Sequence, residues 1–513
     1  MRGEKTHKHG APVHCYMKKP VVLLIRDGWG HHERTANNAP VLADTPYTDY
    51  LKETYPWTLI EASEEAVGLP KGFFGNSEVG HMTLGAGRKL KQPLLRINQA
   101  VNDESLREDE AVQAALEAAE EQDEIHLMGL VQEEGVHADL HHLLALISYV
   151  KDLEVPCHLH LFTDGRDAPI HASIEKIQRI QSAIRNTDIQ ISTVSGRYYA
   201  MDRDHNWDRT EKAYRAIHGE GNAFKDPLRY IKEQHDKGTG DEFILPAKKK
   251  GYKGANKDAP TIFFNFRGDR PRQLTKAFIQ PSFEAFPRER HTGPFVTMTK
   301  YYDDVSADNL HVVIPRLNIT NTFGEYVSQK GYKQLRIAES EKYPHVTYFF
   351  NGRIDHPHPG EKRIHIDSPD VPTYDEQPEM SLFEVTDALL KELKQDEHDF
   401  IIVNYANGDM VGHTGDLDAA VKAAEAVDTN TERLVEAVLD KDGTVFVTAD
   451  HGNCDIMTGQ YRTSHTLMPV EFIRVSNDEK GLRDKGSLTN VAATLLEEKG
   501  VKAPIEFDAS LLG

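Results

Sequence analysis

Three short apolar runs, each followed closely by an aspartate, constrain the fold of this chain more than any other feature. The runs and their aspartates are residues 21–25 with Asp27, residues 400–403 with Asp409 and residues 445–447 with Asp450. Continuous apolar runs without polar alternation are typical of strands buried on both faces of a parallel sheet. Long helical patterns lie between them, for example at 380–393 and 417–439. We therefore predict an α/β doubly wound sheet that brings the three aspartates to its carboxyl edge.

The middle of the chain has its own alternation of strand and helix patterns. Apolar segments at 158–162, 189–194 and 261–266 each lead into a segment that contains arginine. A chain of 513 residues also exceeds the roughly 250–300 residues at which single cores stop growing. We predict a discontinuous metal-binding domain with a second α/β, substrate-binding domain inserted in it. The expected bounds are an N-terminal extension at 1–19, the metal-binding domain at 20–90 and 319–513, and the inserted domain at 91–318.

Charge and cysteine content exclude several classes of function. The formal net charge of −21 disfavours nucleic acid as a partner, and we interpret the short basic run 248–250 as a solvated loop. Cys15, Cys157 and Cys454 lie too far apart for a disulfide scaffold or a cysteine zinc site, which fits a reducing compartment. No apolar stretch reaches the ~18 residues that span a bilayer. We expect a cytoplasmic protein with neither a nucleic-acid nor a membrane partner.

A set of acidic and histidine residues is the strongest indication of chemistry. Its members are Asp27, Asp409, His413, Asp450, His451 and His465. Carboxylates combined with imidazoles suit a hard-to-borderline divalent ion. Six ligands are too many for one tetrahedral site, but they suffice for two ions that share a phosphate. Each residue alone also has an ordinary explanation: Asp27 as a helix cap, or His465 as a satisfied polar side chain.

Ser77 is the second candidate, in the segment Gly75-Asn76-Ser77-Glu78-Val79-Gly80-His81. The small residues permit a tight turn into a helix, whose exposed amides favour an attached phosphate. A serine hydroxyl is a poor nucleophile near neutral pH, so this role requires activation by a neighbouring cation. The alternative interpretation is that Ser77 only caps the helix.

The third candidate set is cationic. It comprises Arg166, Arg197, Arg203, Arg267, Arg270 and Lys342. Guanidinium groups bind carboxylate and phosphate through two parallel hydrogen bonds, although surface salt bridges are the commoner role of scattered arginines. His137 and Asp167 are candidate proton carriers, and either residue could instead be structural.

With these residues in order along the chain, the sequence resembles the 2,3-bisphosphoglycerate-independent phosphoglycerate mutases, members of the alkaline phosphatase superfamily. The resemblance runs from about residue 20 to about residue 507. The motifs that carry it are Asp27-Gly28-Trp29-Gly30, 75–80 with 85–88, Asp164-Gly165-Arg166-Asp167, 197–203, Asn265-Phe266-Arg267, Glu341-Lys342-Tyr343, 409–413, Asp450-His451-Gly452-Asn453 and Ser464-His465-Thr466.

The resemblance implies a monomeric glycolytic and gluconeogenic enzyme that interconverts 3-phosphoglycerate and 2-phosphoglycerate without 2,3-bisphosphoglycerate. Ser77 would take the phosphate from the substrate and return it to the other glycerate hydroxyl. Two divalent ions, manganese in this family, would bind to two sets of residues. These sets are Asp409, His413 and His465 for one ion, and Asp27, Ser77, Asp450 and His451 for the other.

The resemblance also implies roles for the cationic set and its neighbours. Lys342 would stabilise the transferring phosphoryl group, and Asp167 would act as the base for the glycerate hydroxyl. The implied substrate-binding residues are His137, Arg166, Asp167, Arg197, Arg203, Arg267, Arg270 and Lys342. The sequence departs from the family pattern at Arg26, where an apolar residue is typical, at Gly268, where proline is common, and at Glu133-Glu134.

Two other functions remain open from the residues alone. A metal-dependent phosphatase, or a phosphomutase acting on a sugar phosphate, would keep the metal ligands and the nucleophile without needing these arginines. A non-catalytic binding protein would bind metal or ligand without turnover. The presence of every expected ligand and of the serine favours an enzyme.

Overall fold

The computed structural model describes residues 19–301 and 303–513, and the expected N-terminal extension with Cys15 lies almost wholly outside them. The chain divides into two compact units. Of the described residues, the first comprises 19–91 together with Asn318–Gly513, and the second comprises Gln92–Leu317.

The first unit is built on an eight-stranded sheet in the order β12-β11-β13-β1-β14-β15-β2-β16. Five neighbouring strands from β12 to β14 are parallel, whereas β15 is antiparallel to both β14 and β2. The strands in this order are Glu361–Ile366, Gln334–Glu339, Phe400–Tyr405, Val21–Arg26, Thr444–Thr448, Val470–Val475, Trp57–Glu61 and Gly486–Ser487. All residues of β1, β13 and β14 are buried, which confirms the α/β class and these three parallel strands.

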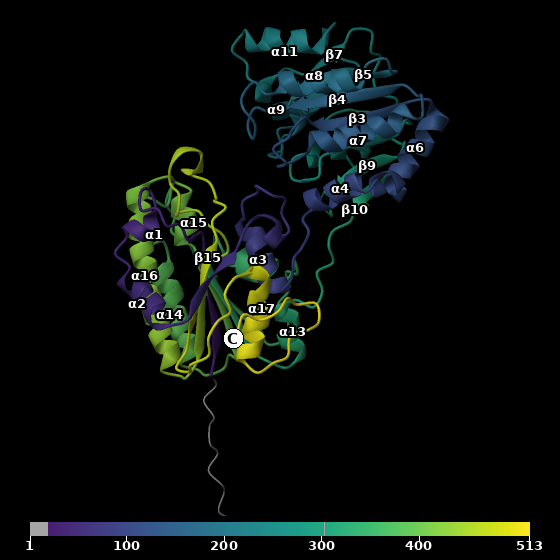
Figure 1. Ribbon diagram of the computed structural model, residues 1–513. Helices are drawn as coiled ribbons and strands as arrows, with labels where there is room; N and C mark the ends of the chain where they lie inside the picture. The colour runs from purple at the N-terminus through teal and green to yellow at the C-terminus, as the bar shows by residue number, and fades with distance from the viewer. Residues whose placement is uncertain (1–18, 302) are drawn as a thin grey trace, which may run out of the picture. The chain divides into compact units, whose positions relative to one another are not determined.

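Helices cover both faces of this sheet (Figure 1). One face carries α2 (Pro46–Thr54), α14 (Leu382–Leu393) and α16 (Leu417–Leu439), and α16 contacts both of the others. The other carries α3 (Ser77–Ala86), α13 (Phe323–Gln329) and α17 (Val491–Glu498). The smaller helical elements of the unit are α1 (Ala39–Leu42), η1 (Glu64–Val67), the π-helix η3 (His345–Phe349), α15 (Asn407–Gly412), η4 (Gly459–Tyr461) and η5 (Leu488–Asn490).

The second unit has its own eight-stranded sheet in the order β10-β9-β8-β3-β4-β5-β7-β6, parallel except where β5 meets β7. Its strands in this order are Leu310–Ile314, Phe295–Thr299, Thr261–Phe263, Ile125–Leu130, Cys157–Thr163, Ile189–Gly196, Ala247–Lys249 and Asn222–Phe224. Its helices are α4 (Pro93–Asn102), α5 (Ser105–Glu108), α6 (Glu110–Gln122), α7 (Leu140–Lys151), α8 (Ser173–Ala183), α9 (Arg197–Ala200), α10 (Trp207–Ile217), α11 (Pro227–His235), η2 (Asp241–Phe243) and α12 (Arg272–Ile279).

Two local expectations were wrong. The basic run 248–250 is not a solvated loop, because Lys248 and Lys249 belong to β7, where Lys248 pairs with Thr193 and its Nζ donates to the backbone oxygen of Gly219. The strand expected at 261–266 ends at Phe263 as β8. Beyond it, the side-chain Oδ1 of Asn265 accepts from the Leu130 amide (2.9 Å).

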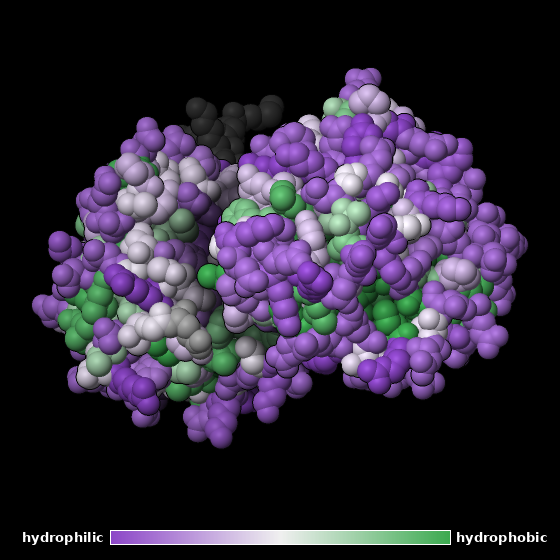
Figure 2. Space-filling model, turned by 90° about the horizontal axis from the view of Figure 1, so that it is seen from above, coloured by the Kyte–Doolittle hydropathy of each residue, from purple (hydrophilic) through white to green (hydrophobic). Residues whose placement is uncertain are grey.

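Apolar side chains gather in the interior of each unit, and the face drawn in Figure 2 is mainly hydrophilic, with hydrophobic residues in small separate groups. Among the helices of the described residues, none is both long and apolar enough to cross a bilayer.

A candidate metal centre around Ser77

Three aspartates converge at the carboxyl ends of three neighbouring strands of the first unit. Asp27 follows β1 directly, Asp450 follows β14 after one residue, and Asp409 lies in the short helix α15 just beyond β13. Adjacent parallel strands end at the same edge, so the strand order β13-β1-β14 brings the carboxylates together. None of the three is more than 2% exposed, and burying three anions requires compensating positive charge.

Ser77 is the first residue of α3, but it does not cap the helix. Asn76 is the cap, and its side chain accepts from the Val79 amide (3.0 Å). The interpretation of Ser77 as a helix cap is therefore wrong, and its hydroxyl is free to face the aspartates. Ser77 Oγ lies 2.8 Å from Lys342 Nζ, 3.1 Å from His451 Nε2 and 3.4 Å from an Asp27 oxygen.

A glycine lets α3 approach the Asp450 loop this closely. A Cβ on Gly80 would lie 2.6 Å from the backbone oxygen of Asp450 and 2.8 Å from its Cβ. Any larger residue would push the helix away, and Ser77, one turn earlier, would move with it. The small residues in this segment therefore serve the approach of the helix as well as the turn.

His413 and His465 face each other beside Asp409. Their Nδ1 atoms lie 3.0 Å and 2.9 Å from the backbone oxygens of Thr463 and Gly75. In the neutral imidazoles those Nδ1 atoms carry the protons, so both Nε2 atoms present lone pairs. The two Nε2 atoms are 3.1 Å apart, and they lie 3.2 Å and 3.3 Å from Asp409 Oδ1. A cation among these three acceptors would relieve their mutual repulsion.

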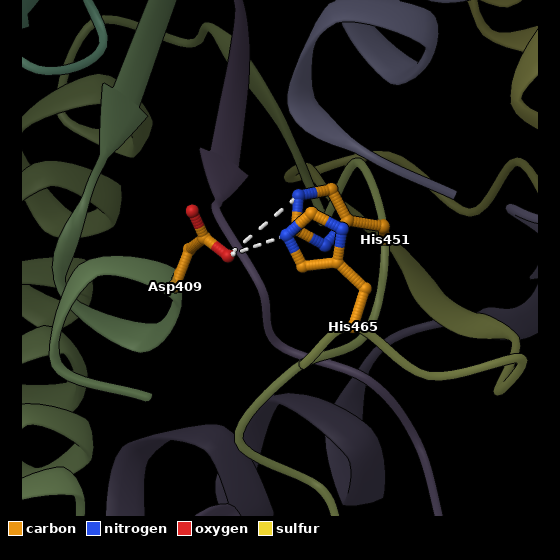
Figure 3. A group of neighbouring side chains, drawn as sticks. All are labelled: Asp409, His451 and His465. Carbon is orange, nitrogen blue, oxygen red and sulfur yellow. Dashed lines mark ion pairs between the residues drawn. The ribbon is translucent and has the colours of Figure 1, made fainter. Parts of the chain in front are cut away.

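His451 lies within reach of all three aspartates. Its Nε2 is 3.4 Å from Asp450 Oδ2, 3.6 Å from Asp27 Oδ1 and 3.9 Å from Asp409 Oδ1. Figure 3 shows the His451 and His465 rings side by side, both directed at the Asp409 carboxylate. Ligand atoms meet within 4.8 Å in two groups, Asp409 with His451 and His465, and Asp27 with Asp450 and His451. The residues thus fit two divalent ions with oxygen and nitrogen ligands.

Lys342 supplies one positive charge against the three buried carboxylates. It lies beyond β11 in a turn where its amide donates to Glu339 O (2.9 Å). Its side chain is 3% exposed, and Nζ lies 2.8 Å from Asp27 Oδ1 and 2.5 Å from Asp409 Oδ2. Burial acts to lower the pKa of Lys342, but Asp27 and Asp409 outweigh it and raise the pKa above its usual value.

Their surroundings shift the pKa values of Asp27 and Asp409 in opposite directions. Burial raises the pKa of Asp27, and the neighbouring Asp450 carboxylate raises it further. Burial would also raise the pKa of Asp409, but the charge of the Lys342 ammonium holds it well below its usual range. Asp409 is therefore an anion across the physiological range and suits a permanent cation partner.

Sequence reasoning missed a second layer of residues that hold these carboxylates. Asn404 Nδ2 donates to Asp27 Oδ2 (2.7 Å), and Asn453 Nδ2 donates to Asp409 Oδ1 (2.7 Å). His81 Nδ1 lies 2.9 Å from Ser77 O and 3.2 Å from Asp450 Oδ2, while its Nε2 lies 3.0 Å from Asn404 Nδ2. Only His81 had a signal in the sequence: it lies one helical turn after Ser77, so a helix would place both side chains on the same face.

We expect His81→Leu to weaken Mn²⁺ binding by about 10- to 100-fold, the usual cost of losing a residue that orients a metal ligand. The leucine removes the donor to Ser77 O and Asp450 from a side chain that is wholly buried. Free Mn²⁺ measured by electron paramagnetic resonance during a titration reports the affinity. His81→Asn, whose amide can replace the Nδ1 donor, is the matched control and should bind more tightly than His81→Leu. Equal affinity in His81→Leu and the wild type would contradict this role.

The arginines and proton carriers gather in the second unit. Arg197 is 2% exposed and pairs with Asp164 (2.6 Å) and with Asp167. Its Nη2 also lies 3.1 Å from His137 Nε2. Burial, aided by Arg197 and Arg267, lowers the pKa of His137 to about 4. The neutral imidazole of His137 and the buried guanidinium of Arg197 thus both lie against the Asp167 carboxylate. The interpretation of Arg197 as part of a surface salt bridge is therefore wrong.

The remaining arginines are more exposed. Arg203 and Arg267 both pair with Asp269 (2.8 Å and 3.4 Å), and Arg166 pairs with Glu242 (3.3 Å). Arg166, Arg197 and Arg270 line a cavity of about 320 Å³ in this unit. Burial and the neighbouring guanidinium groups lower the pKa of Arg270, because like charges held close together disfavour the charged form. An anion bound among them would relieve this repulsion.

The departures from the family pattern have local explanations. A Cβ on Gly268 would lie 2.7 Å from Tyr301 Cα, so glycine permits a close approach. Glu134 pairs with Lys176 (2.7 Å), and Glu133 pairs with Arg179.

Arg26 is buried on the opposite side of its strand from Asp27. Its Nη2 lies 3.0 Å from Glu471 Oε2, its Nη1 donates to Thr48 Oγ1 (3.1 Å), and its guanidinium lies 4.3 Å from the centre of the Trp29 ring. The Arg26–Glu471 pair thus fixes the strand end that presents Asp27.

The chain is similar to known proteins over nearly its whole length. The family model described as the metalloenzyme superfamily matches residues 19–503. A 2,3-bisphosphoglycerate-independent phosphoglycerate mutase of Clostridium botulinum (strain Langeland / NCTC 10281 / Type F) is 44% identical over 508 residues, which cover 96% of this chain and 99% of the relative. The protein of the same name in Clostridium acetobutylicum is 45% identical over 509 residues, with the same coverage.

The similarity extends to a solved structure. The crystal structure of Leishmania mexicana phosphoglycerate mutase at low cobalt concentration has 28% sequence identity and a TM-score of 0.73. The match covers 98% of this chain and 99% of that chain.

Proposed function

Because the chain belongs to the metalloenzyme superfamily and, within it, to the 2,3-bisphosphoglycerate-independent phosphoglycerate mutases, we propose that it interconverts 3-phosphoglycerate and 2-phosphoglycerate through a phosphoserine at Ser77. The observation that carries this proposal is the surroundings of Ser77 Oγ, which lies 2.8 Å from Lys342 Nζ and 3.1 Å from His451 Nε2 beside buried carboxylates. A helix-start serine among cation ligands is placed to become a nucleophile.

The transfer takes place in two balanced halves. In the first, Ser77 Oγ bonds to the substrate phosphorus while the bond from phosphorus to one glycerate oxygen breaks, and that oxygen gains the proton that Ser77 loses. In the second, the other glycerate hydroxyl attacks the phosphoserine. Its proton passes to the Asp167 carboxylate, the bond from phosphorus to Ser77 Oγ breaks, and Ser77 Oγ regains a proton as Asp167 gives one up. Lys342, 2.8 Å from Ser77 Oγ, would stabilise the charge on the phosphoryl group.

When bound, two divalent ions, which we propose to be Mn²⁺, supply positive charge that favours the Ser77 alkoxide and neutralises the phosphoryl oxygens. The residues that would hold them are Asp409, His413 and His465 for one ion, and Asp27, Ser77, Asp450 and His451 for the other. His451 Nε2 is close enough to Asp409 to contribute on that side as well.

We propose that the second unit binds the glycerate. Arg197, with Asp167 and His137 against it, offers a fixed guanidinium to a carboxylate or phosphate. The residues that would complete the site are Arg166, Arg203, Arg267 and Arg270. Holding the glycerate while it reorients would direct the phosphate to the second hydroxyl rather than to water.

We further propose a monomer in the cytoplasm. The net charge of −21 opposes association between copies. The two cysteines of the described residues, Cys157 and Cys454, are both free and buried, which fits a reducing compartment.

Metal removal and return test the function directly. We expect exhaustive chelation to abolish conversion of 3-phosphoglycerate, and Mn²⁺ added back to restore it, because Ser77 depends on cations for activation. The assay quantifies 2-phosphoglycerate and inorganic phosphate together, without 2,3-bisphosphoglycerate. Enzyme dialysed without chelator is the control. Full activity after chelation would refute the metal mechanism, and inorganic phosphate as the main product would make the enzyme a phosphatase.

A further inference from the structure

Lys342 makes three polar contacts at the centre of the metal-binding residues. Its ammonium lies 2.8 Å from Asp27 Oδ1, 2.5 Å from Asp409 Oδ2 and 2.8 Å from Ser77 Oγ. An ammonium has three N–H donors, so these three acceptors use all of them. The side chain is 3% exposed, and water therefore screens its charge poorly.

The two carboxylates that Lys342 contacts belong to different metal groups. Asp27 lies in the group with Asp450 and His451, and Asp409 lies in the group with His451 and His465. At Asp27 the contact involves Oδ1, the oxygen 3.6 Å from His451 Nε2, while Oδ2 is bound by Asn404 (2.7 Å). A divalent ion held by this group would therefore compete with the ammonium for Asp27 Oδ1.

At Asp409 the two carboxylate oxygens have different partners. Oδ2 faces Lys342, while Oδ1 lies 3.2 Å and 3.3 Å from the Nε2 atoms of His413 and His465. The ammonium still lies on the same carboxylate as an ion bound through Oδ1. A divalent ion and an ammonium that share one carboxylate would repel each other strongly, because little water is present to screen their charges.

We propose that Lys342 sets the metal affinity of the centre, because its ammonium competes with divalent ions for the Asp27 and Asp409 carboxylates. The inference rests on the proposed metal ligands of this site and not on its mutase chemistry. The backbone holds Lys342 in place: its amide donates to Glu339 O (2.9 Å) and its carbonyl accepts from the His345 amide (3.0 Å). The positive charge is thus a fixed part of the site, and it makes the centre bind its ions more weakly than the carboxylates alone would.

The test compares Mn²⁺ affinity in variants that separate charge from shape. Lys342→Met removes the charge and the donors, Lys342→Gln removes the charge but keeps donors, and Lys342→Arg keeps the charge. The control Lys89→Met removes the same charge from an exposed position in the same unit. Titration with Mn²⁺ alone, with the free ion measured by electron paramagnetic resonance, gives each dissociation constant.

We expect the Met and Gln variants to bind Mn²⁺ at least about tenfold more tightly than the wild type. Lys342→Arg and Lys89→Met should stay within about twofold of it. In chelator, Lys342→Met should melt at a lower temperature than the wild type, since its carboxylates lose their counter-charge, and Mn²⁺ should raise its midpoint by more. Equal or weaker Mn²⁺ binding by both neutral variants would overturn the proposal.

This outcome is separable from that of the proposed function. Wild-type enzyme that binds Mn²⁺ but forms no 2-phosphoglycerate would refute the mutase proposal and leave the affinity comparison intact. Normal mutase activity in the wild type, together with Mn²⁺ affinity in both neutral variants equal to that of the wild type, would refute only the role of Lys342 in setting affinity.

Discussion

Ser77→Ala is expected to lower mutase turnover by about 10⁴-fold or more, the scale on which enzymes lose activity when their nucleophile is removed. The substitution deletes only the oxygen that lies between Lys342, His451 and Asp27. Ser77 does not cap α3, a role that Asn76 has, so the helix should remain intact. Steady-state formation of 2-phosphoglycerate measures the loss, and mass spectrometry of the enzyme mixed with substrate should detect a phosphoryl group on the wild type alone.

Thr83→Val is the matched control, because it removes a hydroxyl from the same helix at another buried position. It should retain turnover within a few-fold of the wild type. Ser77→Ala should also still bind Mn²⁺ through the aspartates and histidines, which distinguishes a lost nucleophile from a collapsed site. Substantial mutase turnover by purified Ser77→Ala would rule out the covalent route.

Arg26→Met is expected to reduce the free energy of unfolding of the first unit by about 3 kcal/mol, the lower part of the range for breaking a buried ion pair. The change leaves Glu471, 4% exposed, without its nearest buried cation. Burial alone would raise the pKa of Glu471, yet His31, Arg26 and Lys52 hold it at about 2. Lys52 and His31 stay within 3.2 Å and limit the loss. Denaturant unfolding followed by intrinsic fluorescence measures the difference.

Two further variants locate the cause of this loss. The double substitution Arg26→Met with Glu471→Met should recover much of the stability, because it removes the uncompensated charge along with its partner. Arg433→Met breaks an exposed pair with Asp387 and should cost at most about 1 kcal/mol. Stability of Arg26→Met within about 1 kcal/mol of the wild type would contradict the importance of the pair.

The fold was predictable where local patterns determine it. The uninterrupted apolar runs before Asp27, Asp409 and Asp450 predicted buried parallel strands, and these are β1, β13 and β14. The basic run 248–250 was misjudged because charge suggests exposure, whereas the backbone of Lys248 pairs with both β5 and β6 and its ammonium reaches the backbone oxygen of Gly219.

The candidate site was predictable in its reactive atoms but not in the residues that orient them. An acid after a buried strand, or a serine at a helix start, carries its own signal in the sequence. Asn404 and Asp27, by contrast, are 377 positions apart, and their hydrogen bond exists only because β13 lies beside β1. The pairing of Arg26 with Glu471 is equally remote. Such partners follow from strand order, which local patterns do not determine.

The central position of β1 affects how the chain folds as it is synthesised. This strand is made well before both of its neighbours, β13 (Phe400–Tyr405) and β14 (Thr444–Thr448). All strands of the second sheet, by contrast, come from one continuous stretch between them. During synthesis the second unit can therefore complete its sheet before β13 and β14 exist. Until then the apolar β1 has no neighbouring strand, which exposes it to chaperones and to aggregation.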